Sequence, residues 1–82
     1  MNNTEPYLFI GGTNHRQTYN ISKHAKFAQI PKRQQPDNLA YIETETYKRF
    51  PIAEVINGHP KLWSVFAIQG MPKEQVMQYI KQ

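Results

Sequence analysis

The sequence predicts an α+β fold, a small antiparallel sheet of four or five strands with one C-terminal helix packed on one face. Short apolar runs rich in β-branched and aromatic residues follow one another along the chain, and Asn57-Gly58 is typical of a hairpin turn. The C-terminal segment has the apolar spacing of an amphipathic helix. A chain of 82 residues has room for a single domain, residues 1–82, with one small core.

The N-terminal part predicts a hairpin. Residues 1–5 are polar and expected to be frayed, whereas the run from Tyr7 to Ile10 has the composition of a strand. A double glycine then permits positive φ, the segment TNHRQ is too polar to bury, and Thr18 to Ser22 is interpreted as the returning strand. The segment between the strands is therefore interpreted as an exposed turn. In the alternative, a recognition loop, His15 and Arg16 would contact a partner.

The middle of the chain contains a weaker strand signal and a loop. The segment KHAKFAQI is compatible with one more short strand or with irregular chain leading to Pro31, and we expect a strand. Residues 31–38 contain two prolines and no apolar side chain, which predicts an exposed, mobile loop. Lys32 and Arg33 lie side by side there, where they would offer charge to a phosphate or an acidic surface, or simply be solvated.

The segment YIETETYKRF alternates between two sets of residues, and a period of two predicts a strand. One set contains Tyr41, Glu45, Tyr47 and Arg49, which we expect to form a solvent-exposed polar face that carries tyrosines. Such a face suits the stacking of bases or the binding of a protein, because a tyrosine ring is apolar while its hydroxyl tolerates water. In the alternative interpretation, the tyrosines only cover the sheet.

The C-terminal part predicts a second hairpin, which turns at Asn57-Gly58 or over a longer loop because His59-Pro60 follows, and then the helix. The run from Leu62 to Ile68 is almost entirely apolar, which indicates a central strand covered on both faces, with Trp63 and Phe66 on opposite sides. Pro51 indicates that the preceding strand bends, bulges or runs along an edge. In the segment GMPKEQVMQYIKQ, the proline and the glutamate suit a helix N-terminus, and the apolar spacing indicates one face that docks on the sheet.

The layout of YLFIGG near the start, TYKR in the middle and LWSVFAIQGMPKEQVMQYI at the end resembles a loose group of short uncharacterised proteins encoded by tailed phages and prophages. In that group the first strand ends in Gly-Gly, a later strand carries Tyr-x-Arg, and a strand that ends in glycine leads into a short closing helix. Many members have Asp-Gly where this chain has Asn14-His15. The resemblance implies a phage origin and no known activity, and it assigns no functional residue.

The composition argues against catalysis and against a bound metal or cofactor. The chain has no cysteine, and its three histidines do not have the spacing of a zinc site. The acidic residues Glu43, Glu45 and Glu54 are expected on or beside a solvated strand, and neither a phosphate loop nor a nucleophile elbow is present. We therefore expect a protein without enzymatic activity, cofactor or metal. The lack of a signal peptide and of a long apolar run predicts a cytoplasmic protein that does not bind membranes.

Two binding functions are compatible with these observations. The first is a protein-interaction module, a phage accessory protein that binds and inhibits a host protein such as a component of a defence complex or of the transcription machinery. An exposed strand edge would add to a partner sheet or to a second copy of the chain. The candidate partner-binding residues are Tyr41, Tyr47, Arg49, Arg16, His15, Lys32 and Arg33, with Trp63 as a further anchor.

The second function is nucleic-acid binding. The formal net charge is +4, and tyrosines on a sheet face could stack on bases. No aromatic-glycine motif of an RNA-binding sheet supports this function. The basic residues that would contact phosphates are Arg16, Lys23, Lys26, Lys32, Arg33, Lys48 and Arg49.

Overall fold

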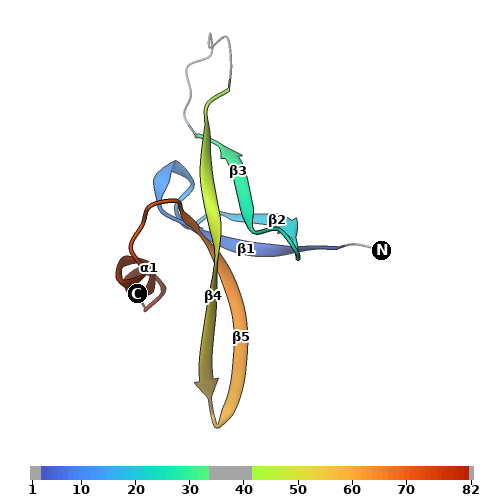
Figure 1. Ribbon diagram of the computed structural model, residues 1–82, viewed down its shortest axis with the longest axis vertical. Helices are drawn as coiled ribbons and strands as arrows, with labels where there is room; N and C mark the ends of the chain where they lie inside the picture. Colours follow the sequence, from blue (N-terminus) through green and yellow to red (C-terminus); the bar gives the residue numbers. More distant parts are fainter. Residues whose placement is uncertain (1–2, 34–41, 82) are drawn as a thin grey trace.

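The computed structural model describes residues 3–33 and 42–81, which form a five-stranded sheet and one helix (Figure 1). Tyr41 and residues 34–38 of the predicted loop lie outside the described residues. The elements are β1 (Thr4–Ile10), a short 3-10 turn (Gly12–Asn14), β2 (Thr18–Ser22), β3 (Phe27–Pro31), β4 (Thr44–Ile56), β5 (His59–Ile68) and α1 (Lys73–Lys81).

The sheet has the strand order β2-β1-β5-β4-β3 and is mixed rather than antiparallel. The α+β class is confirmed at this coarse level, but the prediction of a simple antiparallel sheet is wrong. The N-terminal hairpin joins β5 in parallel through only Phe9↔Phe66 and Ile10↔Ala67. Local turns fix the direction of strands within a hairpin, whereas β1 and β5 are far apart in sequence, so no turn signal specifies how they pair.

The sheet curls around an inner cluster of buried side chains, which gives it a barrel-like shape. Phe9, Ala28, Tyr47 and Phe66 are buried in this cluster. Tyr19 and Ile21 of β2 and Ile30 of β3 pack against the same cluster, although β2 and β3 stand at opposite ends of the strand order. Phe9 stacks on Phe66 with ring centroids 5.2 Å apart and meets Tyr47 edge-on at 4.8 Å.

The outer face of the sheet is covered by α1. The buried members of this second cluster come from β1, β4, β5 and the helix, and Trp63 packs at its border, so Trp63 and Phe66 lie on opposite faces as predicted. The helix begins directly after Pro72, whose carbonyl accepts hydrogen bonds from the first turn. The buried residues of the outer cluster are Ile10, Ile52, Val65, Ala67 and Val76.

β1 begins at Thr4, so Thr4 and Glu5 pair with β2 instead of fraying. β4 continues through Pro51 to Ile56 without a break in its pairing to β5. Pro51 lies beyond the end of the pairing with β3, so β4 runs along an edge there, which is one of the predicted alternatives. The hairpin between β4 and β5 turns over only two residues, Asn57 and Gly58, whose φ angles of 53° and 78° are those that a type I′ turn requires.

Within the described part of the chain, no helix is both long enough and apolar enough to cross a membrane.

Candidate functional site

The polar face that was predicted to be exposed is buried at Tyr47 and Glu45, and for these two residues the prediction is wrong. Tyr47 has no exposed surface and Glu45 is only 8% exposed, because the curl of the sheet turns their face of β4 toward the interior. The alternation indicated a strand correctly, but it could not show which of its two faces the sheet would enclose. The interpretation that the tyrosines cover the sheet is therefore the correct one for Tyr47.

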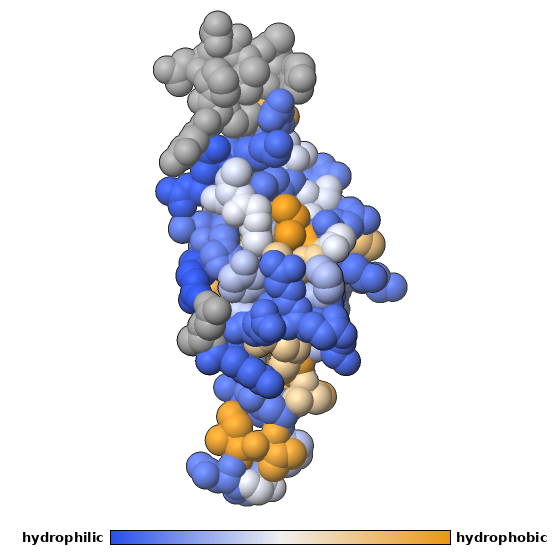
Figure 2. Space-filling model, turned by 90° about the vertical axis from the view of Figure 1, so that its left-hand side faces the viewer, coloured by the Kyte–Doolittle hydropathy of each residue, from blue (hydrophilic) through white to orange (hydrophobic). Residues whose placement is uncertain are grey.

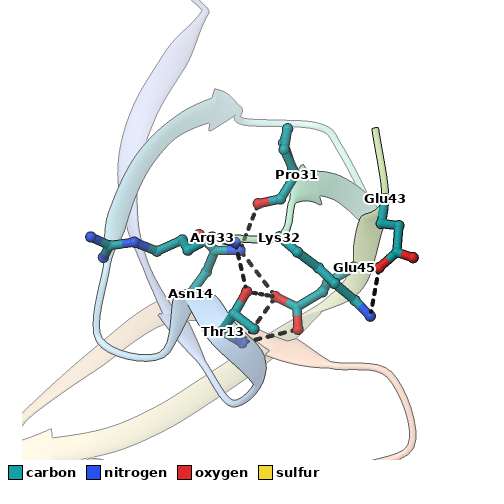
Figure 3. A network of polar contacts seen from close by, with 7 residues as sticks. All are labelled: Thr13, Asn14, Pro31, Lys32, Arg33, Glu43 and Glu45. Atoms are coloured by element: carbon teal, nitrogen blue, oxygen red, sulfur yellow. Dashed lines mark hydrogen bonds and ion pairs between the residues drawn. The ribbon is translucent and has the colours of Figure 1, made fainter. Parts of the chain in front are cut away.

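Glu45 is the centre of a polar network that fastens the 3-10 turn to β4 (Figure 3). The backbone N–H of Thr13 donates to both carboxylate oxygens, at 3.1 and 2.9 Å, and its hydroxyl donates to Oε1 at 2.8 Å. The Asn14 Nδ2 donates to the same Oε1 at 3.0 Å and to the Pro31 carbonyl at 3.1 Å. The Tyr47 hydroxyl lies 2.9 Å from Oε1 and 2.8 Å from the Gly11 carbonyl.

These contacts set the protonation of the network. Burial raises the pKa of Glu45, but the hydrogen bonds from Thr13, Tyr47 and Asn14 together outweigh it and hold the pKa below its ordinary value. Burial, together with the hydrogen bond and the negative charge of Glu45, raises the pKa of Tyr47 to about 12. The pair is thus a carboxylate and a neutral phenol over the physiological range. Both carboxylate oxygens and the phenol oxygen have hydrogen-bond partners within the protein, so the network stabilises the docking of the turn on β4.

Two glycines allow the turn to lie this close to the sheet. A Cβ on Gly11 would lie 2.5 Å from Ile68 Cγ2, and one on Gly12 would lie 2.5 Å from Glu45 Oε2. Both residues also have positive φ, at 89° and 69°. The structure therefore assigns the polar segment between β1 and β2 to a turn docked on β4, with buried Asn14 as its inner side chain.

The two residues of this turn that were candidates for recognition have different surroundings. The Nδ1 atom of His15 accepts a hydrogen bond from the Gly11 N–H at 2.7 Å, and the imidazole ring meets Tyr79 of α1 edge-on at 4.6 Å. His15 thus links the turn to the helix. Arg16 is exposed, and its φ of 67° reflects the sharp turn of the chain into β2.

Arg49 is engaged inside the molecule. Its Nε donates to the Ala25 carbonyl at 2.7 Å and its Nη2 donates to the Ser22 carbonyl at 3.0 Å. The guanidinium lies 4.7 Å from the ring centroid of Tyr7 and 5.0 Å from that of Phe66. Arg49 therefore ties the connection between β2 and β3 to the inner face of the sheet.

Lys32 and Arg33 belong to the same end of the molecule as the Glu45 network (Figure 3). Lys32 forms an ion pair with Glu43, with 3.4 Å between Nζ and Oε2. The backbone N–H of Arg33 donates to the Thr13 hydroxyl at 3.0 Å. The structure thus brings these two residues close to the turn at Thr13, and neither lies near Arg49.

A different region has the features of a binding surface. β3 pairs with β4 only as far as Lys48, and β1 pairs with β5 only at Phe66 and Ala67. The hairpin from Phe50 to Val65 therefore has no neighbouring strand within the described residues. We call this hairpin, residues 50–65, the arm; it projects from the sheet in Figure 1. Its pairing to the turn is continuous, ending at Ile56↔His59.

One face of the arm is apolar and uncovered. The pairs Ala53↔Leu62 and Val55↔Pro60 place these four residues on the same face, and all four are exposed. Val55 is 71% exposed and Leu62 is 82% exposed. Ile56, on the other face, adds a further exposed apolar side chain at the end of the arm, where Figure 2 shows hydrophobic surface gathered.

The arm also presents open backbone edges. The Gln69 N–H donates to the Thr46 carbonyl of β4 at 3.0 Å, so odd-numbered residues along β5 direct their backbone groups to β4 and even-numbered ones direct them away. The N–H and C=O groups of Leu62 and Ser64 and the C=O of Pro60 therefore face outward. On β4 the Arg49 N–H donates to the Lys26 carbonyl, which lies on the side away from β5. The backbone groups of the other odd-numbered residues of β4, among them Ala53 and Val55, therefore also face the outer edge.

The open edge of β5 faces a groove of about 560 Å³ between β1 and the arm. The groove is lined by residues of the N-terminal half of β1, including Pro6 and Tyr7, and by Leu62, Trp63 and Ser64 of β5. The Trp63 Nε1 donates to Glu54 Oε1 at 2.8 Å, which fixes the indole at the groove. Of the predicted anchors that the structure describes, Trp63 is thus the one that lines this candidate site.

Within the described residues, no group of three or more histidine, cysteine, aspartate or glutamate side chains could hold a metal ion. Comparison of the chain with protein-family models, with curated proteins and with solved structures finds no match in any of the three. The resemblance to phage proteins therefore stays a prediction. Sequence reasoning missed the arm as a site, because Phe50, Ile52 and Ile56 alternate with Pro51, Ala53 and Val55 and are apolar as well, so the sequence does not show which face is exposed.

Proposed function

We propose that this protein is a protein-binding module in which an extended segment of a partner adds as a strand to the open edge of β5. The observation that carries the proposal is the outward set of backbone groups on Leu62 and Ser64 beside a groove with apolar walls. In strand addition, main-chain hydrogen bonds supply affinity, and pockets for alternate side chains supply specificity.

The composition of the arm favours a β5 edge that is covered by a partner over a β5 edge that stays in solvent. Proteins commonly blunt exposed edges with charged residues or proline. The β5 edge has such devices only near the turn, at Pro60 and the exposed Lys61, whereas Leu62 and Ser64 direct their N–H donors outward and Leu62 is almost fully exposed. Burying an apolar side chain such as Leu62 against a partner would contribute about 1.5–3 kcal/mol.

The edge can be tested without disturbing the arm. Because the Leu62 N–H faces the groove, Leu62→Pro removes an edge donor but no hydrogen bond to β4. Leu62→Ala removes the side chain and keeps the donor, and Ala53→Pro removes a donor from the opposite edge, on β4. Peptides selected on the parent protein from a random peptide library serve as probes, and the fluorescence of Trp63, the single tryptophan, reports binding at the groove.

We expect the selected peptides to bind Leu62→Pro at least about 10-fold more weakly than the parent and to bind Ala53→Pro with parental affinity. Equal losses in the two proline variants, or a Leu62→Pro variant that binds like the parent, would contradict the proposal. Sedimentation at increasing concentration covers the second-copy alternative. A dimer of the parent that Leu62→Pro abolishes would show that another copy of the chain occupies the edge instead of a partner.

Three statements stay predictions: that the partner is a host protein, that the protein has no enzymatic activity, and, as the alternative function, that it binds nucleic acid. Two of the basic residues named for the last of these already have partners within the protein: Arg49 donates to the Ala25 and Ser22 carbonyls, and Lys32 forms an ion pair with Glu43. A single-stranded oligonucleotide in the same titration, at low and high salt, tests that alternative directly.

A further inference from the structure

A second groove lies on the outer face of the sheet, beside the area that α1 covers. It has a volume of about 490 Å³ and is bounded by the start of β3, the middle of β4 and the turn between β5 and α1. This volume is within the range of about 300–1,000 Å³ that small ligands and short segments occupy. Its apolar walls are formed by Phe27, Phe50, Pro51, Ala67, Ile68 and Met71.

The charges at this groove are of one sign. Lys48 and Lys73 line it, Arg49 contributes with its guanidinium turned to the interior, and no acidic residue is among the lining residues. The two lysines are exposed, and neither has an ion-pair partner within the described residues. Glu74 follows Lys73 in the sequence but does not line the groove. An anion beside both ammonium groups would be attracted by each.

The aromatic side chain at the entrance is uncovered. Phe27 is 52% exposed and lies directly across from Lys48 in the pairing of β3 with β4. A cation and a half-exposed ring thus stand next to each other on one face, beside a groove with apolar walls. This combination suits a ligand that carries a negative charge and a large apolar group close together.

We propose that this groove binds an acidic segment of a partner protein, with a large apolar side chain in the groove and carboxylates near Lys48 and Lys73. The site does not include the open edge of β5, although Pro51 lines both grooves, and it goes beyond the function proposed above. A protein segment fits better than a nucleic acid, because a polynucleotide needs a series of cations along its backbone. Here the two exposed lysines stand among apolar walls.

The test uses the synthetic peptide Ac-Glu-Asp-Phe-Leu-Glu-Asp-NH2 and its uncharged twin Ac-Gln-Asn-Phe-Leu-Gln-Asn-NH2. Binding is followed by nuclear magnetic resonance on the 15N-labelled protein, through the amide signals of Lys48, Gly70 and Lys73. The double variant K48Q/K73Q removes the charge at the groove. The matched variant K26Q/K61Q removes the same charge from lysines that do not line it.

We expect the acidic peptide to shift these amide signals, to bind K48Q/K73Q at least about 10-fold more weakly, and to bind K26Q/K61Q within about 2-fold of the parent. Leu62→Pro should leave this binding unchanged, which separates the site from the β5 edge. Equal weakening in both double variants, or equal binding of the uncharged twin, would overturn the proposal. So would an oligothymidylate that binds the same amides more tightly and depends on Lys48 and Lys73, since the occupant would then be a nucleic acid.

Discussion

β4 and β5 pair in one continuous register, yet they belong to two very different environments. At Tyr47 and Phe66 they are enclosed, with the inner cluster on one face and α1 on the other. In the arm the same two strands have open edges and exposed apolar side chains, among them Val55 and Leu62. An isolated two-stranded hairpin is marginally stable in water. The difference indicates that the enclosed half holds the fold together, while the arm carries the surface that we propose for a partner.

The largest expected effect compares two apolar residues on the same face of β5. Phe66→Ala should lower the free energy of unfolding by about 3–5 kcal/mol, because it leaves a cavity among packed rings. Leu62→Ala should change it by less than about 0.5 kcal/mol, because that side chain is already in water. Chemical denaturation of both variants measures the difference. A cost for Leu62→Ala close to that for Phe66→Ala would mean that the face of the arm that carries Leu62 is packed rather than exposed.

The second comparison concerns two glycines with positive φ, one in each region. Gly12→Ala should destabilise the protein by about 2–4 kcal/mol, because its Cβ would add overpacking to the strain of a left-handed backbone. Gly58→Ala should cost about 1–2 kcal/mol from backbone strain alone, since a Cβ there has no atom within 4 Å. Thermal unfolding monitored by circular dichroism gives both values. Equal costs would show that the turn does not lie as close to Glu45 as described.

The third comparison concerns the buried carboxylate of Glu45 and the surface carboxylate of Glu43. Glu45→Gln should cost about 1–3 kcal/mol at neutral pH, because it replaces a charged acceptor of several hydrogen bonds with an amide. Glu43→Gln, which removes the negative charge of a surface ion pair with Lys32, should cost less than about 0.5 kcal/mol.

The lowered pKa of Glu45 predicts that the stability of the fold depends on pH. The pKa of Glu45 is lowered in the folded state, so its ionisation stabilises the fold above its ordinary value of 4.5, and this stabilisation is lost as the pH falls through the folded-state pKa. The stability difference between the parent and Glu45→Gln should therefore shrink below about pH 4.5. Denaturation at several pH values between neutral and strongly acidic measures it. A difference that stays constant over that range would contradict the role assigned to the carboxylate.

The sequence predicted the local elements well and the long-range arrangement poorly. The Asn57-Gly58 turn, the helix after Pro72 and the opposite faces of Trp63 and Phe66 were confirmed, because each depends on residues close together in the chain. The parallel contact of β1 with β5 and the burial of Tyr47 and Glu45 were not predicted, because both arise from the curl of the sheet. A period of two identifies a strand without showing which face becomes the interior.

Sequence reasoning placed the functional surface at Tyr47 and Arg49 because the period of two does not show that their face of β4 is turned to the interior. Their polar atoms suggested solvent, but the protein supplies their partners: the Gly11 carbonyl and Glu45 for the tyrosine, and the Ala25 and Ser22 carbonyls for the arginine. Conversely, the apolar content of Leu62 to Ile68 suggested uniform burial, although β1 covers the edge of β5 only from Phe66 onward.

The smallest expected effect is a difference in amide hydrogen exchange between the open and the paired edges of the arm, and it is measured on the parent protein without a mutation. Amide hydrogen exchange in the free protein should alternate along each strand of the arm. Donors that face the partner strand, such as those of Ile52 and Trp63, should exchange slowly, whereas those on the open edges should exchange at nearly the rate of unstructured chain. The open-edge donors belong to Ala53, Val55, Leu62 and Ser64.

Binding of a selected peptide then distinguishes the two edges. If the peptide adds to β5, the amides of Leu62 and Ser64 should become protected, while those of Ala53 and Val55 continue to exchange quickly, because only the first pair faces the groove. Protection of Ala53 and Val55 instead would move the site to the edge of β4. Uniform slowing of all four amides would show that the arm is rigidified as a whole, without a strand added at either edge.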